Sequence, residues 1–140
     1  MSSSHHPNGE SSIASKAYES LDKQMLELHG EETAESRADA ERIARALLEK
    51  ADLPLLFRIH SHMVLGCSYK EDSDFLFHAQ EAQRAVELLI SQGGEITPFA
   101  KLLRRSAATI FEEAQESAAS IAADGEDRGE KSSGNGAQSS

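Results

Sequence analysis

The side chains that could bind a metal or attack a substrate gather in the middle of the chain: His60, His62, Cys67 and His78. Imidazole and thiolate groups are the usual protein ligands of zinc. His60 and His62, however, lie about 200° apart on a regular helix of 3.6 residues per turn, so the two cannot hold one ion together. A metal site would have to combine one of them with His78 from a following helix.

His78 has acidic neighbours at helical spacing. Asp74 precedes it by four residues and Glu81 follows it by three, so the three side chains share one face of a helix. Metal-binding bundles use such faces, but their paired Glu-x-x-His signature is absent from this sequence. We therefore predict no metal and no cofactor, with the histidines hydrogen-bonded between helices or facing solvent. A metal- or small-molecule-responsive bundle built on the three histidines and Cys67 is the alternative.

The sequence offers no frame for covalent catalysis. Cys67 follows Gly66, which is expected to end a helix, and the negative pole of a helix end opposes formation of a thiolate. No G-x-S-x-G elbow surrounds the nearby serines, and no glycine-rich loop follows a predicted strand. We predict that the protein is not an enzyme.

The charge and composition disfavour several classes of partner. The 140 residues include 24 acidic and 14 basic side chains. The resulting net charge of -10 repels nucleic acids and anionic membranes. No apolar run approaches the roughly 20 residues of a membrane-spanning helix. The single cysteine cannot form an internal disulfide, and the first 15 residues lack the apolar stretch of a secretory signal. We expect a cytoplasmic protein that binds neither nucleic acid nor membrane, and leave open that the N-terminus is an export leader.

The two ends of the chain differ in composition from its middle. Residues 1–12 and 124–140 are rich in Ser, Gly, Asn and charged side chains and hold almost no apolar ones. Such segments cannot bury enough apolar area to offset an ordering cost of about 1 to 2 kcal/mol per residue. We predict disordered tails at 1–12 and 124–140 around one helical bundle domain at 13–123.

Within this domain, apolar residues recur every three or four positions in five segments, which predicts an all-α fold, a small bundle of four to five helices. The expected helices span 13–29, 33–50, 53–65, 73–91 and the residues after Thr97. The expected boundary signals are Gly30, a capping box of Ser36 with Asp39, Asp52 before Pro54, Gly93-Gly94, and Thr97 before Pro98.

The third segment, 53–65, is the most apolar part of the chain. Its large apolar residues cover most of the circumference of a helix, so we expect this helix to be buried at the centre of the bundle. A short buried strand over 55–59 is the alternative, but Pro54 and the helical spacing of Leu56 and Ile59 favour a helix.

Two features point to a partner. The first helix carries a seam of coiled-coil spacing, and the last helix continues after its large apolar residues have thinned out beyond Ala114. The seam consists of Tyr18, Leu21, Met25 and Leu28. We predict a non-enzymatic protein-interaction module, an adaptor or regulatory protein that self-associates as a homodimer through an apolar helix face. In the alternative monomer, the seam closes over residues 55–65.

A basic cluster could add to this contact. Lys101, Arg104 and Arg105 lie near the start of the last helix and could bind an acidic partner. Pairing with carboxylates of the same chain, such as Glu112 or the acidic loop 71–74, is the simpler interpretation.

Overall fold

Five α-helices make up the computed structural model, and no strand occurs in the backbone that it describes, residues 5–70 and 73–139. Side chains are described for residues 13–70 and 73–125. In chain order the helices are α1 (His5–Gly30), α2 (Ala34–Leu48), α3 (Leu55–Gly66), α4 (Phe75–Gly93) and α5 (Pro98–Ser139). The predicted all-α fold is confirmed. No helix of the described part is both long and apolar enough to cross a bilayer.

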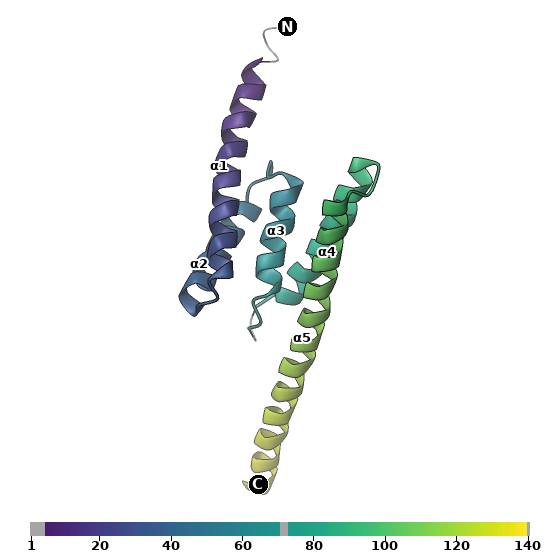
Figure 1. The fold of residues 1–140 in the computed structure, drawn as a ribbon. Coiled ribbons are helices and arrows are strands. Elements are labelled where there is room, and N and C mark those ends of the chain that lie inside the picture. The colour runs from purple at the N-terminus through teal and green to yellow at the C-terminus, as the bar shows by residue number, and fades with distance from the viewer. Residues whose placement is uncertain (1–4, 71–72, 140) are drawn as a thin grey trace.

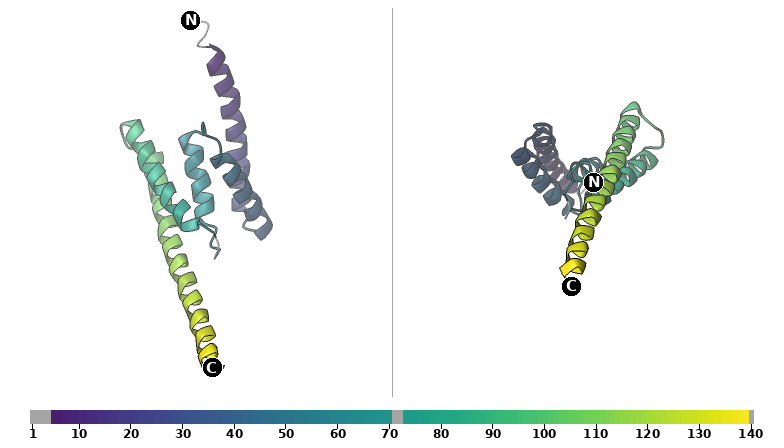
Figure 2. Two further views of the ribbon diagram at one scale, coloured as in Figure 1. Left: turned by 180° about the vertical axis from the view of Figure 1, so that it is seen from behind. Right: turned by 90° about the horizontal axis from the view of Figure 1, so that it is seen from below.

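Helix α3 is the centre of this arrangement. It packs against each of the other four helices, with α1 and α2 paired on one side and α4 and α5 paired on the other (Figure 1). Among the described residues, α1 and α2 do not pack against α4 or α5, and Arg45 of α2 reaches only Asp74, the residue before α4, over 3.9 Å. The view from behind shows the same order, with α3 between the two pairs (Figure 2). The predicted central position of the third segment is confirmed, and it is helical where a strand over 55–59 was the alternative.

The core divides into clusters on the two sides of α3. One cluster joins α1, α2 and α3, and its buried members are Met25, Ala40, Ala44, Leu47, Leu53, Val64 and Leu65. A second cluster joins α3, α4 and α5, and its buried members are Ile59, Ala85, Val86, Leu103 and Ala107. A third cluster joins α4 and α5, and its buried members are Phe75, Ala79 and Ala114. Many of these residues are alanines, whose small side chains allow helices to approach closely. Apolar residues packed in these clusters fall between Tyr18 and Ile121, inside the predicted domain.

The N-terminus of α2 corrects one predicted cap. Thr33 is the N-cap, and its hydroxyl accepts a hydrogen bond of 3.0 Å from the Ser36 amide. The Ser36 hydroxyl in turn accepts one of 3.1 Å from the Thr33 amide, which completes a capping box. Ser36 is therefore the third helical residue and not the cap, and the predicted pairing of Ser36 with Asp39 is wrong. Two bonds of this kind also hold the alanine-rich first half of α2 in helical form.

The start of α3 departs from the prediction, whereas the start of α5 confirms it. Helix α3 begins after Pro54 and has no side-chain cap, so Asp52 does not cap it. The Asp52 carboxylate instead accepts a 2.6 Å hydrogen bond from the Tyr18 hydroxyl. At α5, the Ala100 amide donates to the Thr97 hydroxyl over 3.1 Å, as expected of an N-cap before proline.

Glycines act differently at the ends of α3 and α4. Gly94 ends α4 with φ 82°, a left-handed conformation that glycine adopts without a steric cost. Gly66 is the last residue of α3 and is buried against α4. A Cβ placed on Gly66 would lie 3.0 Å from the Cα atom of Ala79, so the absence of a side chain lets the two backbones approach.

Helices α1 and α5 run into the segments predicted as tails. Helix α1 begins at His5, and α5 continues past the rest of the bundle to Ser139 (Figure 1). The side chains of 5–12 and 126–139, and all of residues 1–4 and 140, lie outside the described part. That these two segments are unpacked tails stays a prediction.

Candidate functional site

The structure separates the three central histidines onto two sides of α3. His60 faces α1, where its Nδ1 atom lies 3.0 Å and 3.1 Å from the two carboxylate oxygens of Asp22. Asp22 is buried and His60 is mostly buried, so this contact joins α1 to α3 inside the fold. The sequence predicted that His60 and His62 point apart, but nothing in the spacing identified Asp22 as the partner.

His62 faces α4 and meets His78. Their Nδ1 atoms are 2.9 Å apart, with ring centroids at 5.1 Å and planes tilted by 31°. A hydrogen bond between two imidazole nitrogens needs one N–H donor and one free acceptor, so the two rings cannot both be protonated. The Nε2 atom of His78 also lies 3.4 Å from the Asp74 carboxylate, which extends the array to the start of α4.

Burial keeps this pair neutral near pH 7. Desolvation, together with repulsion from His78 and Arg58, lowers the pKa of His62 to about 4. Desolvation also lowers the pKa of His78, although the Asp74 carboxylate opposes this change. Among the described residues, no hydroxyl or thiol is hydrogen-bonded to either ring. The array is therefore an interhelical hydrogen bond between neutral imidazoles, one of the arrangements that the sequence favoured.

The four candidate metal ligands do not converge. His60 is bonded to Asp22, His62 and His78 bond to each other, and Cys67 lies in a separate cavity at the end of α3. Glu81, expected on the face of His78, pairs with Arg84 over 3.3 Å. Within residues 13–70 and 73–125, no group of three His, Cys, Asp or Glu side chains could hold a metal ion. The alternative prediction that His60, His62, His78 and Cys67 surround one site is therefore wrong, because the structure places them at three separate positions.

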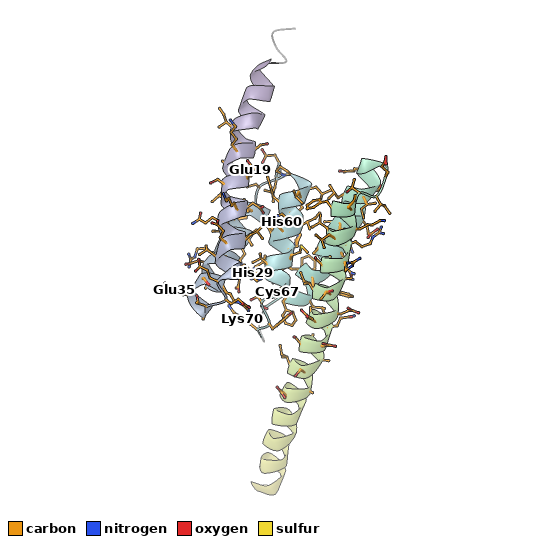
Figure 3. All side chains as sticks on the ribbon, in the orientation of Figure 1. Glu19, His29, Glu35, His60, Cys67 and Lys70 are labelled. Carbon is orange, nitrogen blue, oxygen red and sulfur yellow. The ribbon has the colours of Figure 1, made fainter. Side chains whose placement is uncertain are left out.

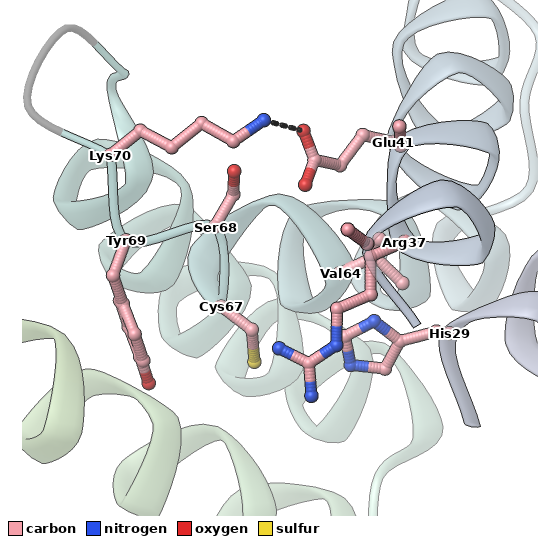
Figure 4. Close-up of a pocket in the computed structure, with 10 residues that line it drawn as sticks. His29, Arg37, Glu41, Val64, Cys67, Ser68, Tyr69 and Lys70 are labelled. Carbon is pink, nitrogen blue, oxygen red and sulfur yellow. Dashed lines mark hydrogen bonds and ion pairs between the residues drawn. The ribbon is translucent and has the colours of Figure 1, made fainter. Parts of the chain in front are cut away.

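Cys67 follows the last residue of α3 and lines a cavity of about 330 Å³ between α2, the end of α1 and the loop after α3. Burial and the negative charge of Glu113 raise the pKa of its thiol, so it is protonated at neutral pH. The remaining lining side chains are His29, Ala34, Arg37, Ala38, Glu41, Val64, Ser68, Tyr69 and Lys70 (Figure 4). Arg37 carries no signal in the sequence that marks it as a cavity residue, because only the fold brings α2 beside the loop.

The seam of α1 is largely used inside the chain. Met25 is fully buried in the core, and Tyr18 and Leu28 pack partly buried against the same cluster. Leu21 alone among the four is exposed. Met25 cannot reach a partner in this structure, and the seam closes over α3 as in the monomer alternative.

The basic cluster is divided between pairing and exposure. Arg104 makes two 2.8 Å contacts with the Glu87 carboxylate, a bidentate pair between α5 and α4. The pairing within the chain is as expected, but its partner is neither Glu112 nor the loop 71–74, of which 71 and 72 lie outside the described residues. Lys101 and Arg105 are exposed, and no ion pair joins them to another described side chain.

Large apolar side chains are exposed at the turn between α4 and α5. Leu88, Ile96, Phe99 and Leu102 are 50%, 44%, 53% and 57% exposed. Phe99 and Leu102 are three residues apart and share a face of α5, and Ile96 lies in the turn just before them. We call these four residues, which are grouped by their place in the chain on either side of the turn, the hairpin-end surface. Lys101 and Arg105 lie on the same two turns of α5.

Family models, curated proteins and solved structures give no match to this chain. The hairpin-end surface and the cavity beside Cys67 lie at opposite ends of the bundle, as the positions of Cys67 and Lys70 show (Figure 3). They are the two features on which a function can be based.

Proposed function

We propose that this chain is a non-enzymatic helical protein-interaction module, of the adaptor or regulatory kind, that forms a homodimer through the hairpin-end surface. The observation that carries the proposal is the exposure of Leu88, Ile96, Phe99 and Leu102 within one short stretch around the α4–α5 turn. Single exposed apolar residues are common, but a group of large ones marks a contact surface.

The expected dimer is weak. Burying the exposed half of a large apolar side chain contributes about 1 kcal/mol, so eight such side chains from two copies contribute about 8 kcal/mol. Association costs about 4 to 15 kcal/mol in lost translational and rotational freedom. At the lower limit of that cost about 4 kcal/mol remains, which corresponds to a dissociation constant of about 1 mM, so association should become visible only at concentrations of several hundred micromolar.

Charge also favours this end of the molecule. Two copies that each carry a net charge of -10 repel one another. Lys101 and Arg105 lie close to Phe99 and Leu102 in the sequence, and no described ion pair uses them, whereas Arg104 is paired with Glu87, so two positive charges remain at this end of an acidic molecule. Lys101 and Arg105 could equally bind an acidic surface on a different protein. That an acidic partner binds these two residues therefore stays a prediction.

The test is a comparison of molar mass between variants. Phe99→Ser combined with Leu102→Ser removes two of the four exposed side chains, and Leu26→Ser is the control because Leu26 is a comparably exposed leucine on α1. Light scattering from about 50 µM to about 1 mM spans the range expected for a weak dimer. The wild type and the control should rise from 15.2 kDa towards twice that mass, whereas the double variant should stay near 15.2 kDa.

Two outcomes would contradict the proposal. One is a wild-type mass that stays at 15.2 kDa at every concentration. The other is equal association of all three proteins, which would place the contact elsewhere. Circular dichroism of each variant confirms that the helical fold is retained before the masses are compared.

A further inference from the structure

The three core clusters divide the molecule into two parts that meet along α3. The first cluster joins α1, α2 and α3, and the third joins α4 and α5. The second cluster, which contains Ile59, Val86 and Leu103, joins α3 to the hairpin of α4 and α5. Among the described residues, α1 and α2 do not pack against this hairpin. Opening the contact between α3 and the α4–α5 hairpin would therefore leave α1, α2 and α3 packed around the first cluster.

A buried pair of histidines lies in this contact. The Nδ1 atoms of His62 on α3 and His78 on α4 are 2.9 Å apart, and the two residues are 9% and 7% exposed. The Nε2 atom of His78 lies 3.4 Å from a carboxylate oxygen of Asp74, which can only accept a hydrogen bond. His78 therefore carries its proton on Nε2, and its Nδ1 accepts from the Nδ1–H group of His62. The neutral state satisfies this contact without a buried charge.

An added proton finds no favourable place in this pair. On Nδ1 of His78 it would point at the Nδ1–H group of His62, and on Nε2 of His62 it would put a charge on a buried ring. Burial accordingly lowers the pKa of both rings. The described charges that act on them are Arg58 on α3, Arg45 on α2, Asp74 before α4 and Glu81 on α4. The arginines repel a protonated ring, and the attraction of Asp74 is screened because its side chain is 58% exposed.

The other side of α3 responds to a proton in the opposite sense. His60 contacts both carboxylate oxygens of Asp22 on α1, and the Asp22 side chain is 8% exposed. A positive charge on His60 attracts this carboxylate, so protonation strengthens the contact between α1 and α3. His29, at the end of α1, is acted on by charges of both signs, since Arg37 repels its protonated ring and Glu41 attracts it.

We propose that the joint between α3 and α4 is an acid-operated release. Protonation of the His62–His78 pair separates the α4–α5 hairpin from α3, whereas α1, α2 and α3 stay together and are held more firmly by His60 and Asp22. The released state uncovers the apolar faces that meet in the second cluster. The fold would thus carry a pH-sensitive switch whose moving part is the hairpin.

Hydrogen exchange measured helix by helix tests this division. The full chain is compared at pH 7 and pH 5 by mass spectrometry of fragments, with each rate referred to that of an unstructured amide at the same pH. A hairpin without α3 is only marginally stable, so its amides exchange from the released state. Because the pKa of His62 is about 4 in the closed state and 6.5 when the ring is free, protection of 75–93 and 98–114 should fall about 20-fold. Protection of residues 34–48 should stay within about threefold of its value at pH 7.

Histidine variants assign the response to its source. His62→Gln removes the titrating ring but keeps a hydrogen-bonding group toward His78, and it should abolish the 20-fold loss. His60→Gln is the matched control on the same helix and should keep that loss. His78→Gln serves the same purpose as His62→Gln if the latter does not fold by circular dichroism. A concentration of about 20 µM keeps self-association out of the measurement.

Three results would overturn the proposal. Equal losses of protection in α2, α4 and α5 would mean that acid unfolds the whole bundle at once. Unchanged protection of α4 and α5 at pH 5 would mean that the histidine pair does not control this joint. The same loss in the wild type and in His62→Gln or His78→Gln would place the responsible proton elsewhere.

Discussion

Acidification should destabilise the fold through His62. In the folded protein, burial beside His78 lowers the pKa of His62 from 6.5 to about 4. The unfolded chain therefore binds the proton more tightly than the folded chain does. The stabilisation is fully present above pH 6.5 and is lost as the pH falls from 6.5 towards 4.

The size of the effect follows from this difference in proton affinity. At about 1.4 kcal/mol for each factor of ten, the full difference between folded and unfolded His62 is about 3 kcal/mol. About 2 kcal/mol of it should be lost between pH 7 and pH 5, because the unfolded imidazole is then almost fully protonated and the folded one is not. This is a large share of the stability of a typical small domain.

The measurement is urea unfolding at pH 7 and pH 5 for the wild type and for His62→Gln. The glutamine amide can still hydrogen-bond to His78 but does not titrate. Carboxylates and the histidines that do not contact His62 affect both proteins in the same way, so they cancel in the comparison. The free energy of unfolding of the wild type should fall by about 2 kcal/mol more than that of the variant. Equal losses in the two proteins would refute the placement of a buried neutral His62 against His78.

Two further substitutions test how the helices begin and pack. Gly66→Ala should lower the free energy of unfolding by about 1 to 3 kcal/mol, because its Cβ would lie 3.0 Å from the backbone of Ala79. Gly93→Ala is its control, since nothing lies within 4 Å of the added carbon, and a loss as large as that of Gly66→Ala would contradict the close-packing explanation. Thr97→Ala removes the cap that accepts from the Ala100 amide and should cost about 1 kcal/mol in the same unfolding assay. No loss at Thr97 would show that α5 does not depend on this bond.

The periodic features of the sequence predicted the helices well. Helix α3 could be placed at the centre because its apolar residues surround the helix, which leaves no face for solvent. Pro98 after Thr97 and the two glycines at the end of α4 are local signals, and the structure uses Thr97 as a cap and Gly94 as the left-handed residue. Helical geometry also separated His60 from His62 correctly.

Features that depend on two distant segments could not be predicted. The sequence predicted the cap of α2 at Ser36, whereas the helix begins after Thr33, close in the chain to the end of α1. The pairing of His60 with Asp22 joins residues 38 apart in the sequence and has no local signature. The seam containing Met25 looked the same whether it packs on α3 or on a second copy, because both surfaces are apolar helices.

The cavity beside Cys67 was hidden from the sequence for the same reason. Arg37 stands on a polar stretch of α2, and Ser68 is one of several serines near the histidines. Their common place in the lining of one cavity becomes visible only when the loop after α3 lies beside α2. A polar residue type does not reveal whether its hydrogen bonds are satisfied.

The most direct test of the interaction surface is an NMR concentration series of the wild-type protein. Amide signals of residues 88–102 should shift as the concentration rises from about 10 to about 500 µM, while those of residues 34–48 stay in place. The overall tumbling time should lengthen in parallel. Amide shifts that do not change with concentration anywhere in the chain, together with the tumbling time of a 15.2 kDa monomer, would contradict self-association through the hairpin-end surface.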